Sequence, residues 1–140
     1  MTLPPTLHLQ RDFAASPEAV FDAWVNTTLL RRWLFASPTN EFPRFQVQAR
    51  VGGKFSLLER DLGETVDYFG QYFEIDPPRR LVFTLNVPKH FPGESLVTVE
   101  ITALLEGCAL NLTQAGVEPK ITRSRWLAMF DQLDAILVAH

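Results

Sequence analysis

The sequence predicts an α+β domain in which a curved antiparallel sheet of about seven strands surrounds a long C-terminal helix, with two short helices after the first strand. Between residues 44 and 114, six strand-like segments are joined by short turn sequences, which is typical of an antiparallel meander. Residues 118–138 then repeat apolar side chains at three- and four-residue spacing, the period of a helix. A helix of about twenty residues spans roughly 30 Å, so this segment is long enough to cover the apolar face of the sheet.

The N-terminal part begins with a strand and a helix. Residues 6–13 alternate apolar and polar side chains, which predicts a half-buried strand. Ser16 and Pro17 are typical of an N-cap and a first helical position, and one apolar stripe follows them. This first helix is expected to end near Asn26.

A second short helix and the strands of the meander follow. Thr27 or Thr28 is expected to cap that helix, and Trp33 belongs to its buried side. Residues 37–43 contain two prolines and are predicted to form a loop. The strands are then expected at residues 44–51, 54–60, 66–75, 80–86, 95–102 and 108–114. With 140 residues and no linker-like stretch, residues 1–140 are expected to form a single domain.

The strand at residues 66–75 has aromatic side chains on both faces. Tyr68 and Tyr72 share one face, and Phe69, Phe73 and Ile75 share the other. If the first face lies in the core, the second forms an exposed apolar patch, extended by Val82 and Leu96. Such patches often mark association surfaces, so a homodimer is one expectation.

Composition and charge exclude several classes of protein. The net charge is −3 and the arginines are scattered, so the Lys/Arg cluster that nucleic-acid binding needs is missing from the sequence. No stretch approaches 18 consecutive apolar residues, so no membrane span is predicted. Residues 1–10 do not resemble a signal peptide, and the single cysteine, Cys108, suits a reducing compartment. The expected location is therefore the cytoplasm.

Sequence motifs along almost the whole chain resemble one known family. The most specific is Gly-Gln-Tyr-Phe-Glu-Ile-Asp-Pro-Pro-Arg-Arg-Leu-Val-Phe-Thr at residues 70–84. The other matching pieces are residues 11–13, 16–24, 51–55, 97–99 and 110–113, Leu30 with Trp33, and Trp126 with Leu133. Together they resemble the START-like (SRPBCC) superfamily, and within it the activator of heat-shock protein ninety ATPase homologue (AHSA) family.

The resemblance implies the helix-grip fold, also known from the birch pollen allergen, in which relatives commonly leave an apolar cavity between the sheet and the C-terminal helix. The sequence departs from the family pattern at three places near the expected pocket edge. Gln114 stands where members often have His, Arg125 where they often have Gly, and Leu34 where they often have a second Trp.

Aromatic side chains are the main candidates for a binding site. Concave apolar sites with a few polar groups are where small ligands bind, although large rings also fill ordinary cores. Phe35 belongs to this group, and the residues predicted to line a cavity are Trp24, Trp33, Phe45, Phe55, Tyr68, Tyr72, Phe83, Trp126 and Phe130.

Three polar residues share strand parity with apolar neighbours and are expected to point inward. For Arg11 and Glu59 one interpretation is a salt bridge or a rim charge, since a buried charge must be paired. The other is that they anchor the polar group of a ligand. Gln114 is expected either to bond a helix carbonyl or to face the cavity and bond a ligand.

The sequence therefore favours binding of a small hydrophobic or lipid-like ligand over catalysis. No catalytic set, no metal-ligand spacing and no cofactor motif is present in it, and no cofactor is expected. One alternative is an enzyme of the cyclase or hydrolase kind that uses the same cavity, as some START-like relatives are. The other is a protein-interaction role in which the chain binds and stimulates a chaperone ATPase, as the family name implies.

Overall fold

The computed structural model describes residues 5–138. The elements follow one another as β1 (Thr6–Phe13), α1 (Pro17–Val25), α2 (Thr27–Trp33), β2 (Glu41–Val47), β3 (Lys54–Asp61), β4 (Glu64–Asp76), β5 (Arg80–Asn86), β6 (Glu94–Ala103), β7 (Cys108–Ala115) and α3 (Pro119–Val138).

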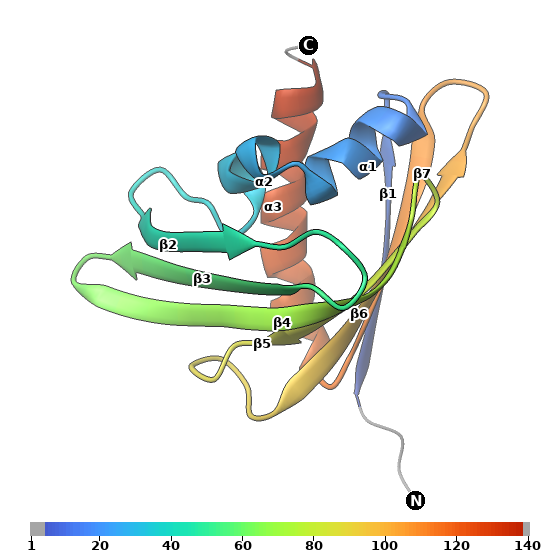
Figure 1. Ribbon diagram of the computed structural model, residues 1–140. Coiled ribbons are helices and arrows are strands. Elements are labelled where there is room, and N and C mark those ends of the chain that lie inside the picture. The colour runs from blue at the N-terminus through green and yellow to red at the C-terminus, as the bar shows by residue number, and fades with distance from the viewer. Residues whose placement is uncertain (1–4, 139–140) are drawn as a thin grey trace, which may run out of the picture.

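The seven strands form one antiparallel sheet in the order β1-β7-β6-β5-β4-β3-β2. The sheet curves around α3, and α1 and α2 lie at one end of the concave side (Figure 1). The first strand pairs with the last, so the chain returns to its own beginning before α3 crosses the sheet. This is the predicted α+β class, and the helix-grip fold is confirmed.

The two short helices share one capping residue. As predicted, Ser16 caps α1, and its hydroxyl accepts a hydrogen bond from the backbone N–H of Ala19 at 3.2 Å. The predicted cap of α2 was wrong. Asn26, not Thr27 or Thr28, accepts from the first-turn amides of α2 through Oδ1. Asn is preferred over Thr at this position, and the extended backbone of Asn26 allows it to close α1 and open α2 at once.

The predicted bounds of β2 were also wrong. The strand runs over Glu41–Val47 rather than residues 44–51, so Pro43 lies inside it. Pro43 is tolerated because β2 is the last strand of the sheet, and a register shift occurs there. Beyond Val47 the backbone folds into tight turns, and Val51, the expected end of this strand, is 63% exposed.

The outer face of the sheet has an apolar patch, which is defined here as Phe69, Phe73 and Leu96. These side chains are 42%, 54% and 44% exposed, respectively. Val82 lies on the same face of β5 and is half-buried. The patch agrees with the expected parity of β4, and its use as an association surface stays a prediction.

Ile75 does not belong to this patch, contrary to the prediction. A register shift between Tyr72 and Glu74 places one extra residue in β4 relative to β5. Such a bulge reverses the side-chain alternation beyond it. Ile75 therefore pairs with Leu81 and packs against the core.

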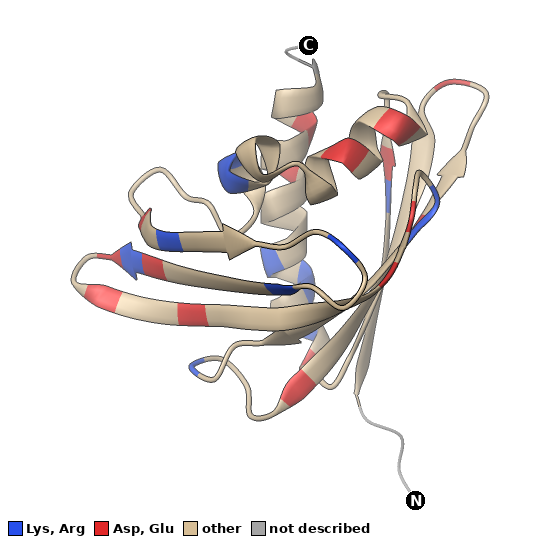
Figure 2. Cartoon of the chain, viewed as in Figure 1, with Lys and Arg blue, Asp and Glu red and all other residues tan. Residues whose placement is uncertain are grey.

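Charged residues of both signs occur on β2 and β3, and β4 beside them carries only acidic residues (Figure 2). Several form ion pairs between strands, such as Arg44 with Asp67 and Arg60 with Glu41, both at 2.8 Å. Across the described residues, no helix is both long and apolar enough to cross a membrane.

Candidate functional site: an aromatic cavity beneath the C-terminal helix

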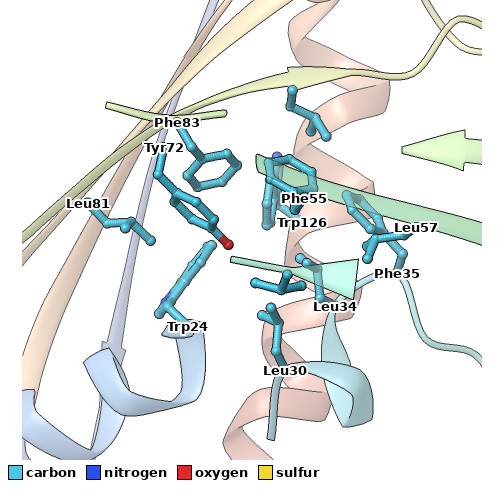
Figure 3. Close-up of a pocket in the computed structure, with 12 residues that line it drawn as sticks. Trp24, Leu30, Leu34, Phe35, Phe55, Leu57, Tyr72, Leu81, Phe83 and Trp126 are labelled. Carbon is cyan, nitrogen blue, oxygen red and sulfur yellow. The ribbon is translucent and has the colours of Figure 1, made fainter. Parts of the chain in front are cut away.

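A cavity lies between the concave face of the sheet and the three helices (Figure 3). Its volume, counted at the centre of a water molecule, is about 20 Å³, which is room for roughly one water. Apart from single polar atoms of Trp24, Tyr72 and Trp126, its side chains are apolar. The lining residues are Trp24, Leu30, Leu34, Phe35, Val47, Phe55, Leu57, Tyr72, Leu81, Phe83, Leu85 and Trp126.

Strand alternation explains why these side chains converge. Phe55 and Leu57 are two residues apart on β3, and Leu81, Phe83 and Leu85 follow the same period on β5, so each set faces inward. The cross-strand partner of Phe55 is Gly70. A Cβ at Gly70 would lie 2.8 Å from the Phe55 ring and 1.8 Å from the carbonyl oxygen of Thr84, so the glycine makes room for that ring.

The structure brings together five of the nine aromatic residues predicted to line a cavity: Trp24, Phe55, Tyr72, Phe83 and Trp126. Trp33 and Phe130 form a second layer behind Trp24, with ring centroids 4.7 and 6.2 Å from it. The Trp33 indole N–H donates to the carbonyl of Ala23 at 3.0 Å, so its polar atom is used within the fold.

Tyr72 brings a hydroxyl group into this apolar space. The residue is 4% exposed, and Figure 3 shows its oxygen pointing into the pocket. Among residues 5–138 the hydroxyl has no hydrogen-bond partner, and its oxygen keeps a small accessible surface. Burial raises the pKa of Tyr72 to about 12, so the phenol is neutral at pH 7. A second lining residue, Trp24, has a buried indole N–H that is also without a partner.

The side-chain amide of Gln114 is hydrogen-bonded within the core, and Gln114 is not part of the cavity lining. Its Oε1 accepts a hydrogen bond from the Trp126 indole N–H at 2.8 Å, and its Nε2 donates to Ser95 Oγ at 2.9 Å. Ser95 Oγ in turn donates to the carbonyl of Leu85 at 2.8 Å. The amide therefore bonds a helix side chain, which is neither of the two predicted arrangements.

A polar cluster lies at the rim of the cavity, where Phe35 is half-exposed. The Phe35 ring lines the cavity and stacks on Tyr68, with centroids 3.9 Å apart. The Tyr68 hydroxyl donates to Glu59 Oε1 at 2.6 Å, and the side-chain amide of Asn40 donates to both Glu59 and the Phe35 carbonyl. Burial, and then the hydrogen bond and charge of Glu59, raise the pKa of Tyr68 well above its ordinary value.

His90 and Arg125 lie near this cluster. The His90 ring approaches Tyr68 edge-on, with centroids 6.5 Å apart. Burial, and next the positive charge of Arg125, lower the pKa of His90, which therefore favours its neutral form. Glu59 is thus a rim carboxylate held by two neutral donors, and neither it nor Tyr68 lines the cavity.

Two further predicted residues lie away from the cavity. Arg11 forms a salt bridge with Asp131 of α3 at 2.9 Å, so the salt-bridge interpretation is the one that the structure contains. Phe45 lies on the edge strand β2, edge-to-face with Phe42 and beneath the guanidinium of Arg31. Both residues hold the periphery of the fold together.

Sequence reasoning did not include the aliphatic half of the lining. Its members are Leu30, Leu34, Val47, Leu57, Leu81 and Leu85. Their inward parity was visible in the sequence, but a pattern that places residues in a core does not say which of them border free space. Within residues 5–138, no group of three or more His, Cys, Asp or Glu side chains is arranged to hold a metal ion.

Comparison with known structures finds the same fold in several bacterial proteins. Protein CV1439 from Chromobacterium violaceum is 26% identical, with a TM-score of 0.83 over 94% of this chain and 96% of that one. The AHSA1-like protein from Aeromonas hydrophila is 21% identical, with a TM-score of 0.81 over 96% and 93% of the two chains. Protein SA2116 from Staphylococcus aureus, described as of unknown function, is 17% identical, with a TM-score of 0.82 over 96% and 94%.

A comparison with curated protein sequences finds no match. The family model described as "Activator of Hsp90 ATPase homolog 1-like protein" matches residues 14–138, which include all three helices and six of the seven strands. The chain therefore belongs to the Activator of Hsp90 ATPase homolog 1-like family, within the START-like superfamily.

Proposed function

We propose that this chain binds a small hydrophobic molecule in the cavity between the sheet and α3. The observation that supports the proposal is the lining itself: twelve apolar or aromatic side chains, from seven helices and strands and from the turn after α2, border one interior space. Burial of about 200 Å² of apolar ligand surface in such a site releases roughly 5 kcal/mol.

Binding requires the cavity to widen. Its volume is about 20 Å³ in this conformation, whereas sites for drug-sized ligands are typically about 300–1,000 Å³. Phe35 is the lining residue best placed to move, because it is half-exposed and its backbone has a positive φ of 56°. A non-glycine residue in this region is strained. Rotation of the Phe35 ring away from Tyr68 would open the cavity at the rim.

The test is equilibrium binding of N-phenyl-1-naphthylamine, an uncharged dye whose fluorescence rises in apolar surroundings. Val47→Phe adds volume at the half-buried edge of the lining and is expected to weaken dye binding by at least about tenfold. Val51→Phe is the matched control, because Val51 is 63% exposed in a turn outside the lining. An unsaturable dye signal, or equal affinities in the two folded variants, would contradict the proposal.

A further inference from the structure

The Tyr72 hydroxyl indicates what chemistry a ligand of the cavity must have. A buried hydroxyl without a hydrogen bond costs free energy, because the group has lost its contact with water. Tyr72 is only 4% exposed, and its oxygen points into the pocket. The other side chains of the lining are hydrocarbon, apart from the indole N–H groups of Trp24 and Trp126.

A water molecule is a poor partner for this hydroxyl. Buried waters typically make about three hydrogen bonds to polar groups. The lining residues have three side-chain polar atoms: Tyr72 Oη, the Trp24 N–H, and the Trp126 N–H, which already donates to Gln114. The first two can both act as donors. A water here would have at most two side-chain partners, the lower end of the range for buried waters, whereas a ligand with an apolar body and one acceptor atom would satisfy the hydroxyl and fill the remaining space.

We propose that the cavity selects uncharged, compact apolar molecules with a carbonyl-type hydrogen-bond acceptor, and that Tyr72 Oη is the donor that selects them. This inference rests on the proposed function, because it concerns the same cavity. Charged ligands are disfavoured, since no charged side chain lines the space to compensate a buried charge. Tyr72 is unionised at pH 7, since burial raises its pKa to about 12, and it therefore keeps the proton that it donates.

The experiment compares 1-tetralone with tetralin, two molecules of nearly equal shape that differ by one carbonyl group. Each compound is titrated against N-phenyl-1-naphthylamine bound to the wild-type protein, to Tyr72→Phe and to Tyr68→Phe, and the loss of dye fluorescence gives its affinity. The readout is the ratio of the two affinities in each protein, because the ratio cancels the loss of dye binding that any change in packing causes. Tyr68 provides the matched control, since its hydroxyl is bonded to Glu59 and does not line the cavity.

The expected result is that Tyr72→Phe lowers the tetralone-to-tetralin affinity ratio by roughly threefold to tenfold, the value of one hydrogen bond. Tyr68→Phe is expected to leave the ratio unchanged. The inference is overturned if the ratio is the same in wild-type and Tyr72→Phe, even though both compounds displace the dye. That outcome would leave cavity binding intact. If neither compound displaces the dye, or the dye itself does not bind, the proposed function fails together with the inference.

Discussion

The indole N–H of Trp126 donates a 2.8 Å hydrogen bond to Oε1 of Gln114, and both residues are at least 98% buried. The bond joins α3 to β7, and Trp126 is itself part of the cavity lining. Both ends of the amide are satisfied, because Gln114 Nε2 donates to Ser95. This relationship fixes how α3 is positioned over the sheet, and therefore the position of one wall of the cavity.

Replacement of Gln114 by Met tests the bond. The substitution conserves volume but leaves the Trp126 N–H buried without an acceptor, which is expected to lower the free energy of unfolding by about 1–3 kcal/mol. Urea unfolding monitored by circular dichroism measures the change. Asn111→Met on the exposed side of the same strand is the control and should change stability by less than about 0.5 kcal/mol. Equal effects of the two substitutions would refute the structural role of Gln114.

The two tyrosines are expected to respond in opposite ways to removal of their hydroxyl groups. Tyr72→Phe removes a buried hydroxyl without a partner, so we expect the ligand-free protein to become more stable by about 1 kcal/mol. Tyr68→Phe removes a donor from the Glu59 carboxylate and is expected to cost about 2 kcal/mol. Thermal and urea unfolding of both variants provide the comparison. A loss of stability in Tyr72→Phe would mean that its hydroxyl has a partner in solution.

Alkaline pH offers a test that needs no mutation, because the chain contains only two tyrosines. An unfolded tyrosine has a pKa of about 10. In the folded protein the pKa of Tyr72 is raised to about 12, and that of Tyr68 is raised further. The unfolded state therefore releases protons first, and the stability contributed by these neutral phenols is complete below pH 10 and is lost as the pH rises toward 12.

Absorbance at 295 nm follows the phenolates directly. We expect almost no phenolate signal at pH 11 while the far-ultraviolet circular dichroism remains native, and then a joint change of both signals as the protein unfolds. A titration of one tyrosine near pH 10 in the native protein would contradict the burial described for these residues.

Leu62 provides a prediction about local backbone strain. It is 91% exposed in the β3–β4 turn, with a positive φ of 53°. Asn tolerates this region better than Leu, so Leu62→Asn is expected to raise stability by about 0.5–1 kcal/mol. Leu105→Asn is the control, because Leu105 is fully exposed without a positive φ. If both substitutions give the same change in thermal midpoint, the strain at Leu62 has no measurable effect.

Much of the fold was predictable because local chemistry and the global arrangement agree. Ser16 and Pro17 marked the start of α1, and the alternation in β3 and β5 placed Phe55 and Phe83 inward. The failures occurred where tertiary pairing overrode a local signal. Pro43 indicated a loop but lies in an edge strand, and the bulge after Tyr72 turned Ile75 inward although strict alternation predicted the outer face.

The candidate site was less predictable than the fold. Parity identified Glu59, Gln114 and Tyr72 as inward residues, but it could not say which of them would find partners. Glu59 accepts hydrogen bonds from Tyr68 and Asn40. Gln114 bonds Trp126 and Ser95. All four partners come from other segments of the chain. Such pairs depend on how α3 and the loop after α2 pack on the sheet, which is not encoded in the period of any single segment.

Native mass spectrometry of the freshly purified protein tests the central claim most directly. The account predicts a second species whose additional mass disappears on denaturation, and whose added compound is uncharged, largely apolar and contains a carbonyl-type acceptor. The amount of this species should fall in Val47→Phe but not in Val51→Phe. A single mass equal to that of the 140-residue chain, with no shift after incubation with a library of apolar ketones and hydrocarbons, would contradict the claim that the cavity is a ligand-binding site.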